Sequence, residues 1–326
     1  MNLSRVATPI RSPALRIGTN LLSQRTQPCL HLVSVYRLST AAAVKELRAQ
    51  TGAPMMECKK ALSSPEVDGD LQKAMEWLRK HGTQKASAKV IGREAPEGLV
   101  GICIGEKASS VVKVASETDF ASRSETFSGF VQEVADAAAK QGEIAELSAF
   151  LTGTKNDSGK LLSESLNDVI LSIRENIQVD SISLMKASPN SVFGGYVHNR
   201  VAGSNCGSAA AVVELQACKE VADAKEIAKR LAMHVVAARP AYLNPESVPE
   251  DVVQKEKEIL MEKMADSNKP KEIMEKIITG QLRKFYEQLC LTEQAHMVEE
   301  GNPKVGKFLK GLGLEVTGFK SMDTSK

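Results

Sequence analysis

The segment from Gly98 to Ala138 changes its apolar pattern from that of a β-hairpin to that of an amphipathic helix. Apolar residues predominate in two short runs, 99–104 and 110–115, on either side of the turn Gly105-Glu106-Lys107. This arrangement is typical of a hairpin. Further along, apolar residues recur at helical spacing, at Phe127, Phe130, Val131, Val134 and Ala138. An antiparallel hairpin followed directly by a helix predicts the α+β fold class.

The residues Thr118-Asp119-Phe120 lie at the joint between this hairpin and the helix. An acidic residue next to a large apolar one is unusual there, because residues in such turns are mostly small and polar. The pair is therefore a candidate functional tip. Ser122 and Glu125 match a capping box, which would place Asp119 and Phe120 two or three residues before the helix begins. In the structural alternative, Phe120 staples the helix start and Asp119 interacts favourably with the helix dipole. On the local pattern alone we favour this alternative.

Residues 1–43 differ from the rest of the chain in charge. They contain five Arg residues, many Ser and Thr residues, and no Asp or Glu. An acid-poor, Arg-rich and Ser-rich N-terminus is typical of an organellar transit peptide, and the Arg content favours the mitochondrion over the plastid. We expect cleavage near Arg37-Leu38-Ser39-Thr40 and a location in the mitochondrial matrix. The alternative is a tail without a targeting role.

Removal of this segment changes the charge balance. The remaining chain has 37 Lys and Arg residues against 40 Asp and Glu, a net charge of −3. General nucleic-acid binding needs clustered cations, so we expect no binding to nucleic acid. No apolar run approaches the length of a membrane span, and no membrane association is expected. The six Cys residues form no Cys-x-x-Cys pair, which argues against a metal site or a disulfide framework.

Residues 44–83 predict a small three-helix module. The expected helices are 44–50, 54–62 and 71–80, with Asp70 as an N-cap and Gly82 at the C-terminal cap. Residues 84–97 are polar and predict a linker, either without regular structure or partly helical around Lys85–Lys89. Met55 and Met56 are adjacent, so either they fill an irregular core or they form a flexible apolar contact surface. The spacing alone favours neither interpretation.

The remainder predicts a two-part α+β core, with subdomains at 98–180 and 181–326. Helices are expected at 161–175 and 226–238. Strands are expected at 181–186, 193–198 and 209–215, and a short helix and a closing strand at 305–312 and 314–319. Residues 250–289 predict two amphipathic helices joined as an antiparallel hairpin. The hairpin is a candidate contact for a partner or for a second copy of the chain, and the alternative is a pair of packed surface helices without a binding role.

No constellation of catalytic residues is visible. The sequence has no phosphate-binding G-x-x-x-x-G-K-[ST] loop, no G-x-G-x-x-G after a strand, no H-E-x-x-H and no nucleophile elbow. We therefore expect no catalytic residues, no metal, no cofactor and no direct nucleotide binding. His234 shares a helix face with apolar residues and predicts a hydrogen-bonded core residue. His198 ends a strand beside a loop and is a candidate contact residue.

Several stretches match one known family in order. These are 44–48, 51–62, the segment Glu117-Thr118-Asp119-Phe120, the tripeptide Glu175-Asn176-Ile177, 234–240 and 269–273. They cover about residues 44–319, and the chain resembles the translation elongation factor Ts family. Together with the N-terminal segment, it looks like a mitochondrial form.

The resemblance implies a guanine nucleotide exchange factor that binds elongation factor Tu. It implies a ubiquitin-associated-like fold for the first module, with Arg48, Met55 and Met56 on its contact surface. It also implies that a loop corresponding to Asp119 and Phe120 wedges into the GTPase and disturbs its Mg²⁺ and phosphate region, so that GDP leaves and GTP can enter. The helical hairpin resembles an insertion found in bacterial members of the family.

The chain departs from the family pattern in three places. Residues 121–124 differ after the tip, which predicts weaker loop contacts. Arg174 replaces a common Gly, and the sequence after Phe319 diverges, which predicts a shortened closing strand. An alternative function from another class is a non-exchanging adaptor that binds ubiquitin-like or nascent-chain partners through the three-helix module.

Overall fold

The structure is a computed structural model that describes residues 40–51, 53–90, 93–217, 221–264 and 271–325. The predicted transit peptide, residues 1–43, lies outside these ranges except for its last four residues, which belong to the first helix. The α+β class is confirmed, and every pairing between the named strands is antiparallel. In the described part of the chain, no helix is both long enough and apolar enough to cross a lipid bilayer.

The N-terminal module has its own small core. Its helices are α1 (Thr40–Thr51), α2 (Met55–Leu62) and α3 (Leu71–Val90). Leu47, Cys58 and Ala74 are fully buried among neighbours from all three helices. The predicted N-cap is confirmed, because Asp70 Oδ1 accepts hydrogen bonds from the backbone N–H groups of Gln72 and Lys73. The predicted end at Gly82 is wrong, since α3 runs on through residue 90 into the segment expected to be a linker.

The first sheet has the strand order β3-β2-β1-β5. Its strands are β1 (Glu97–Ile104), β2 (Ala108–Ser116), β3 (Gln178–Lys186) and β5 (Cys206–Gly207), and β1 and β2 form the predicted hairpin. The predicted boundary between residues 180 and 181 falls inside β3, which pairs with β2. Helices α4 (Asp119–Ser122), α5 (Glu125–Gln141), α6 (Leu147–Gly153) and α7 (Leu162–Ile173) follow β2 in the chain.

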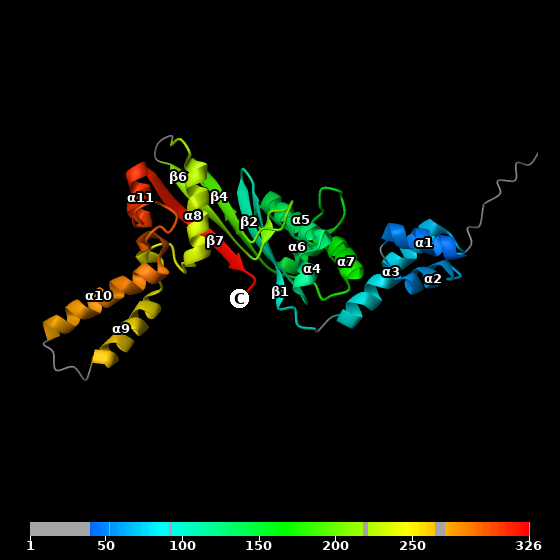
Figure 1. Ribbon diagram of the computed structural model, residues 1–326, viewed down its shortest axis with the longest axis horizontal. Helices are drawn as coiled ribbons and strands as arrows, with labels where there is room; N and C mark the ends of the chain where they lie inside the picture. The colour runs from blue at the N-terminus through cyan, green and yellow to red at the C-terminus, as the bar shows by residue number, and fades with distance from the viewer. Residues whose placement is uncertain (1–39, 52, 91–92, 218–220, 265–270, 326) are drawn as a thin grey trace, which may run out of the picture. The chain divides into compact units, whose positions relative to one another are not determined.

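One face of this sheet packs against helices. Phe127, Val131 and Val134 of α5 are fully buried against β1 and β2, and α7 completes the cluster through Leu162 and Val169. Helix α6 was not predicted. It supplies Phe150 to the same cluster from a segment that the sequence indicated as mainly loop. Figure 1 shows α5, α6 and α7 together beside β1 and β2.

The second sheet has the order β4-β6-β7, from β4 (Ser191–His198), β6 (Ala209–Ala217) and β7 (Leu314–Asp323). Helices α8 (Ala224–Ala238) and α11 (Val305–Leu312) cover one of its faces, and the buried cluster includes Leu231 and Leu309. The expected shortening of the closing strand is wrong. Strand β7 pairs with β6 along its whole length, from Leu314 to Asp323.

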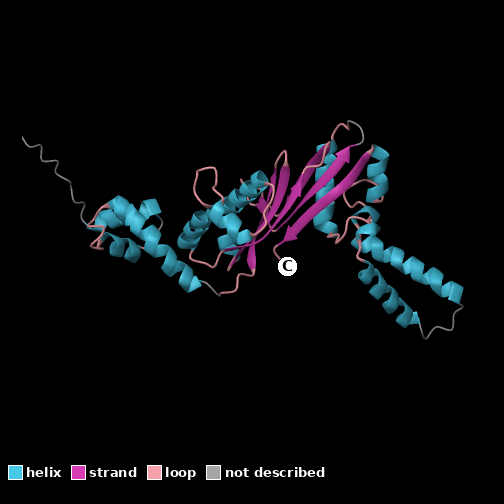
Figure 2. Cartoon of the chain, turned by 180° about the vertical axis from the view of Figure 1, so that it is seen from behind, coloured by secondary structure: helices cyan, strands magenta, loops and turns pink. Residues whose placement is uncertain are grey.

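The two sheets pack face to face. Val100, Ile102 and Val111 of the first sheet form one buried cluster with Phe193 and Val212 of the second. The core therefore has helices outside and two sheets inside, and the strands are drawn together in magenta in Figure 2. This arrangement fixes the ends of the strands, including the end of β2, where the candidate tip begins.

The predicted helical hairpin is confirmed as two helices, α9 (Glu250–Met264) and α10 (Lys271–Leu289). The apolar stripe predicted on α10 is only half-buried along its length, at Met274, Ile278, Leu282, Phe285 and Leu289. Ile259, Met261 and Ile273 are more exposed still. Self-association through this hairpin stays a prediction.

A pair of buried histidines links α8, which carries His234, to the segment after α10, which carries His296. His234 and His296 are fully buried with ring centroids 5.1 Å apart, and His234 Nε2 lies 3.1 Å from Gln294 Oε1. The core role predicted for His234 is thus confirmed. Burial lowers the pKa of both rings, and with the neighbouring His234 it lowers the pKa of His296 from 6.5 to about 4.

This pair predicts a loss of stability in mild acid. Because the pKa of His296 is lower in the folded state, the unfolded chain binds its proton more strongly, and stability falls as pH drops from 6.5 towards 4. His296 alone should lower the free energy of unfolding by about 2 kcal/mol between pH 7.5 and pH 5. Urea unfolding at the two values measures this. The decrease should be smaller in His296→Gln and unchanged in the exposed control His198→Gln, and an equal decrease in all three proteins would contradict the assignment.

Candidate partner-binding surface

The candidate tip is a single helical turn rather than an open loop. Helix α4 comprises Asp119–Ser122, and Thr118 is its N-cap, with the side chain accepting a hydrogen bond from the backbone N–H of Ala121. Ala121 and Ser122 are buried and face the core. The capping box predicted at Ser122 is wrong. Ser124 is the N-cap of α5, and its Oγ accepts from the backbone N–H of Phe127.

Phe120 is directed into solvent. Its side chain is 83% exposed, the largest exposure among the large hydrophobic side chains of the described residues. A stapling role would bury this ring against the following helix, so the structural reading favoured from the local pattern is wrong. Asp119 and Arg123 form an exposed ion pair, with Oδ2 of Asp119 3.4 Å from Nη2 of Arg123. Such an exposed pair contributes little to stability. An exposed aromatic ring at the end of a rigid turn is suited to insertion into a partner.

The backbone before Phe120 is held from a distant part of the chain. Glu175 accepts two hydrogen bonds from Thr118, one from the backbone N–H at 3.0 Å and one from the hydroxyl at 2.7 Å. In the opposite direction, Glu117 accepts the backbone N–H of Asn176 at 2.6 Å. Asn176 Nδ2 donates to the carbonyl oxygen of Arg93 at 2.7 Å. The side chain of Arg93 forms an ion pair with Glu117, with Nη1 3.4 Å from Oε2.

Sequence reasoning noted Glu117, Glu175 and Asn176 only as matches to a family pattern and gave them no role in positioning the tip. The pairing of β2 with β3 explains why they meet. Ala115 pairs with Gln178 at the end of the ladder, so the residues that follow β2 continue beside those that precede β3. Periodicity within one segment contains no signal for such a contact.

Arg174, next to this contact, adopts a left-handed backbone conformation with φ 65° at the end of α7. Glycine is preferred at this position because a Cβ atom disfavours that conformation. Arg174→Gly should therefore raise the free energy of unfolding by about 0.5–1 kcal/mol. The control Arg174→Ala removes the exposed side chain but keeps Cβ, and it should give no gain. Guanidinium unfolding compares the two, and an equal gain in both would show that the side chain, rather than the backbone, carries the strain.

Both candidate methionines of the first module are exposed. Met55 and Met56 are 58% and 63% exposed at the start of α2, so the reading that both fill the core is wrong. Arg48 is exposed on α1, which packs against α2. These three side chains thus belong to the surface of the three-helix module, and their role in binding stays a prediction.

His198 is the last residue of β4 and is exposed. Its ring nitrogen Nδ1 lies 3.4 Å from the hydroxyl of Tyr196. The structure therefore places the predicted contact residues in three places. Thr118, Asp119 and Phe120 lie together on the tip, Arg48 and the two methionines on the module, and His198 at the end of a strand of the second sheet.

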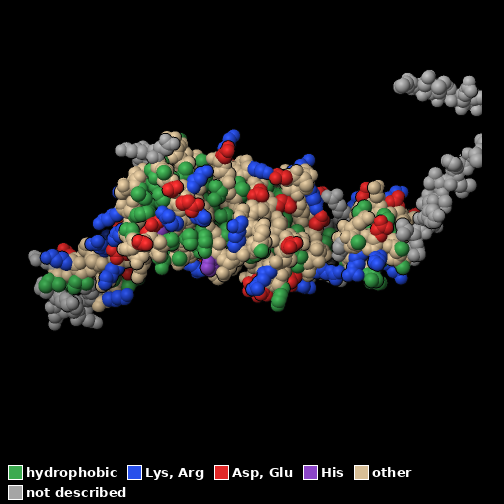
Figure 3. Space-filling view, turned by 45° about the horizontal axis from the view of Figure 1, so that its top comes forward, with side chains coloured by type: hydrophobic (Ala, Val, Ile, Leu, Met, Phe, Trp, Pro, Cys, Tyr) green, Lys and Arg blue, Asp and Glu red, His purple; other side chains and the backbone are tan. Residues whose placement is uncertain are grey.

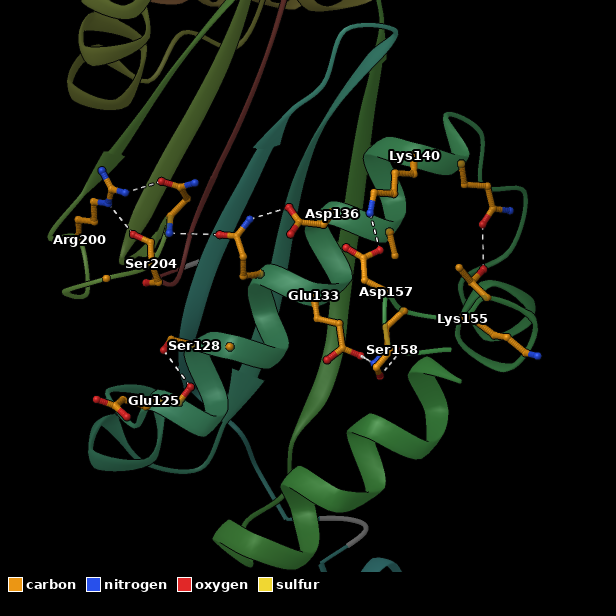
Figure 4. Close-up of a pocket in the computed structure, with 18 of the residues that line it drawn as sticks. Glu125, Ser128, Glu133, Asp136, Lys140, Lys155, Asp157, Ser158, Arg200 and Ser204 are labelled. Carbon is orange, nitrogen blue, oxygen red and sulfur yellow. Dashed lines mark hydrogen bonds and ion pairs between the residues drawn. The ribbon is translucent and has the colours of Figure 1, made fainter. Parts of the chain in front are cut away.

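A polar groove of about 1120 Å³ runs along the outer side of α5. Figure 4 shows Glu133, Asp136 and Lys140 on α5, with the segment around Asp157 on one side and Arg200 on the other. These groups are paired with one another or with neighbours. Asn156 donates to Glu133, Gln132 donates to Asp136, and Lys140 forms an ion pair with Asp157. We assign no ligand to this groove.

On the face drawn in Figure 3, Lys and Arg side chains are interspersed with Asp and Glu. Within the described ranges, no group of three or more His, Cys, Asp or Glu side chains is placed to hold a metal ion. The most distinctive surface feature is thus the exposed Phe120 on its short, anchored turn.

Comparison with known proteins identifies the class of protein to which this fold belongs. Residues 117–326, which begin at the tip, match the family described as "Elongation factor TS". The elongation factor Ts of Paramagnetospirillum magneticum is 39% identical over 277 residues, which cover 85% of this chain and 86% of the relative. That of Rhodospirillum rubrum is 39% identical over 278 residues, covering 85% and 87%. The protein of the same name from Gluconobacter oxydans is 37% identical over 281 residues, covering 86% and 90%.

A match over most of the chain at this identity is decisive. The chain belongs to the elongation factor Ts family.

Proposed function

We propose that this protein is a guanine nucleotide exchange factor that binds elongation factor Tu carrying GDP and promotes the release of GDP. The observation that carries the proposal is the exposed Phe120, held on a capped turn within a chain of the elongation factor Ts family. In this proposal Phe120 and Asp119 insert into the GTPase and disturb its Mg²⁺ and phosphate region. Thr118 shapes the turn that presents them.

Such a protein acts by binding and needs no catalytic acid or base. If it binds the nucleotide-free GTPase more tightly than the GDP-bound form, it must weaken GDP binding by the same factor. GTP then occupies the emptied site and displaces the exchange factor. Arg48, Met55, Met56 and His198 supply further contact surface in this proposal, because all four are exposed.

We further propose that the protein works in the mitochondrial matrix, with mitochondrial elongation factor Tu as its partner. The support is the composition of residues 1–43, which contain Arg, Ser and Thr but no acidic residue. Import into isolated mitochondria, with and without residues 1–43, tests the location. Import of the shortened chain as efficient as that of the full chain would contradict a targeting role.

The release of labelled GDP from purified elongation factor Tu tests the exchange activity. The full chain should accelerate release in proportion to its concentration until the GTPase is saturated. A chain that does not accelerate GDP release but binds ubiquitin-like or nascent-chain partners through the three-helix module would be the adaptor of the alternative function. A chain that neither accelerates GDP release nor binds such partners would contradict both functions.

A further inference from the structure

We infer that Glu175 is a positioning residue for the tip. Glu175 affects a GTPase partner only indirectly, by holding the Thr118 end of the turn that carries Phe120. The inference rests on the proposed exchange function and names a residue through which that function is controlled. Glu175 is half-buried. Its carboxylate binds both the backbone N–H and the hydroxyl of Thr118.

The tip needs such a support because α4 is only four residues long. A single helical turn has an unfavourable nucleation free energy and is unstable in isolation. The exposed ring of Phe120 adds little packing of its own, so its direction depends on the backbone of residues 118–122. Ala121 and Ser122 anchor the inner side of the turn by burial, and Glu175 anchors the end from which the turn begins.

Strand register determines which residue reaches Thr118. The β2–β3 ladder shifts by one residue between Lys113 and Val114, after which Val114 pairs with Val179 and Ala115 with Gln178. Continued at this register, Glu117 lies opposite Asn176 and Thr118 opposite Glu175, as their hydrogen bonds show. Without the shift, Thr118 would lie opposite Asn176 instead. The β-bulge thus brings a carboxylate with two acceptor oxygens to a residue with two donors.

The hydrogen bonds between Glu175 and Thr118 can fix the turn of residues 118–122 before a partner binds. A turn that is fixed before binding avoids the loss of conformational entropy that a mobile loop would suffer on insertion. Every polar group of Thr118 makes a hydrogen bond that holds the tip. Its backbone N–H and hydroxyl donate to Glu175, Oγ1 accepts from the N–H of Ala121, and its carbonyl oxygen accepts from Ser116 Oγ and the N–H of Ser122.

The test is a double-mutant cycle on GDP release from elongation factor Tu. Glu175→Ala should slow the accelerated release about fivefold, through loss of preorganisation. Phe120→Ala and the double variant should release GDP at nearly the same rate as each other, because Glu175 acts only through the tip and Phe120 is its main contact. If the two effects multiply instead, Glu175 has a separate role and the inference is overturned.

Two further variants separate positioning from a general loss of stability. Glu175→Gln keeps an acceptor for the Thr118 N–H and offers a donor to the Thr118 hydroxyl, so it should recover most of the rate. A rate as low as that of the alanine variant would contradict positioning through these hydrogen bonds. Glu106→Ala, at the exposed turn at the other end of the same hairpin, is the matched control and should match wild type.

A measurement without the partner tests the contact directly. Amide hydrogen exchange at Thr118 should be faster in Glu175→Ala, while exchange at Val112 in the middle of β2 should not change. Equal exchange at Thr118 in both proteins would show that Glu175 does not hold the tip. Failure of the wild-type chain to accelerate GDP release would contradict the proposed function, whereas wild-type acceleration with an unaffected Glu175→Ala variant would contradict only the positioning role.

Discussion

Phe120→Ala is expected to slow the release of GDP from elongation factor Tu by about tenfold or more compared with the wild-type chain, the effect of losing an interface hot spot. The ring is 83% exposed in the free protein. Its removal therefore costs almost nothing within the fold, and the whole effect should fall on the interaction. Stopped-flow measurement of labelled GDP at saturating exchange factor gives the rate.

The control for this prediction is Ile104→Ala. Ile104 is also a large exposed hydrophobic residue, 46% exposed, and lies at the far end of β1 from the tip. It should leave the rate close to wild type. The unfolding midpoint of Phe120→Ala should also equal that of wild type. An unchanged GDP-release rate in a correctly folded Phe120→Ala variant would remove the tip from the proposed mechanism.

Gly194→Ala is expected to destabilise the fold by about 3 kcal/mol, near the upper end of the usual cost of overpacking a core. Gly194 lies in β4, where α8 packs directly on the strand. A Cβ atom there would lie 2.3 Å from the carbonyl carbon of Ala228 and 2.4 Å from the backbone nitrogen of Lys229. Both are helix backbone atoms, so the whole helix would have to move. Chemical denaturation of the two proteins gives the difference in the free energy of unfolding.

Gly129→Ala is the matched control. Gly129 lies within α5, and a Cβ atom added there meets nothing within 4 Å. Because alanine is favoured over glycine in a helix interior, this variant should gain about 0.5–1 kcal/mol. Opposite signs at the two glycines are the expected result. Equal effects would mean that backbone entropy, rather than the close approach of α8 to β4, determines the response.

Local patterns predicted the elements whose apolar residues repeat clearly. The β1–β2 hairpin follows two mainly apolar runs, and α5 follows a repeat that begins at Phe127 and is buried along its length. The paired helices of residues 250–289 were predicted from the same kind of evidence. The short helix α6 was missed, because it buries only Phe150 and so carries no repeat.

Errors at the tip have a different cause. Ser122 and Ser124 can both cap a helix, and only the structure shows that Ser122 Oγ donates back to Asp119 while Ser124 caps α5. Likewise, the local sequence is compatible both with a Phe120 that staples the helix and with an exposed Phe120. The choice between them depends on how the end of β2 meets the start of β3, which is a property of the sheet and not of the segment.

The separation of Thr118 and Glu175 by 57 positions in the chain has a consequence for the order of folding. A contact between distant residues forms only after the chain between them has closed, which slows its appearance. The tip should therefore gain its fixed shape after α5 and α7 have docked and β3 has joined β2. On this expectation a chain still leaving the ribosome, with residue 120 already exposed but residue 175 not yet available, has no ordered wedge to offer a partner.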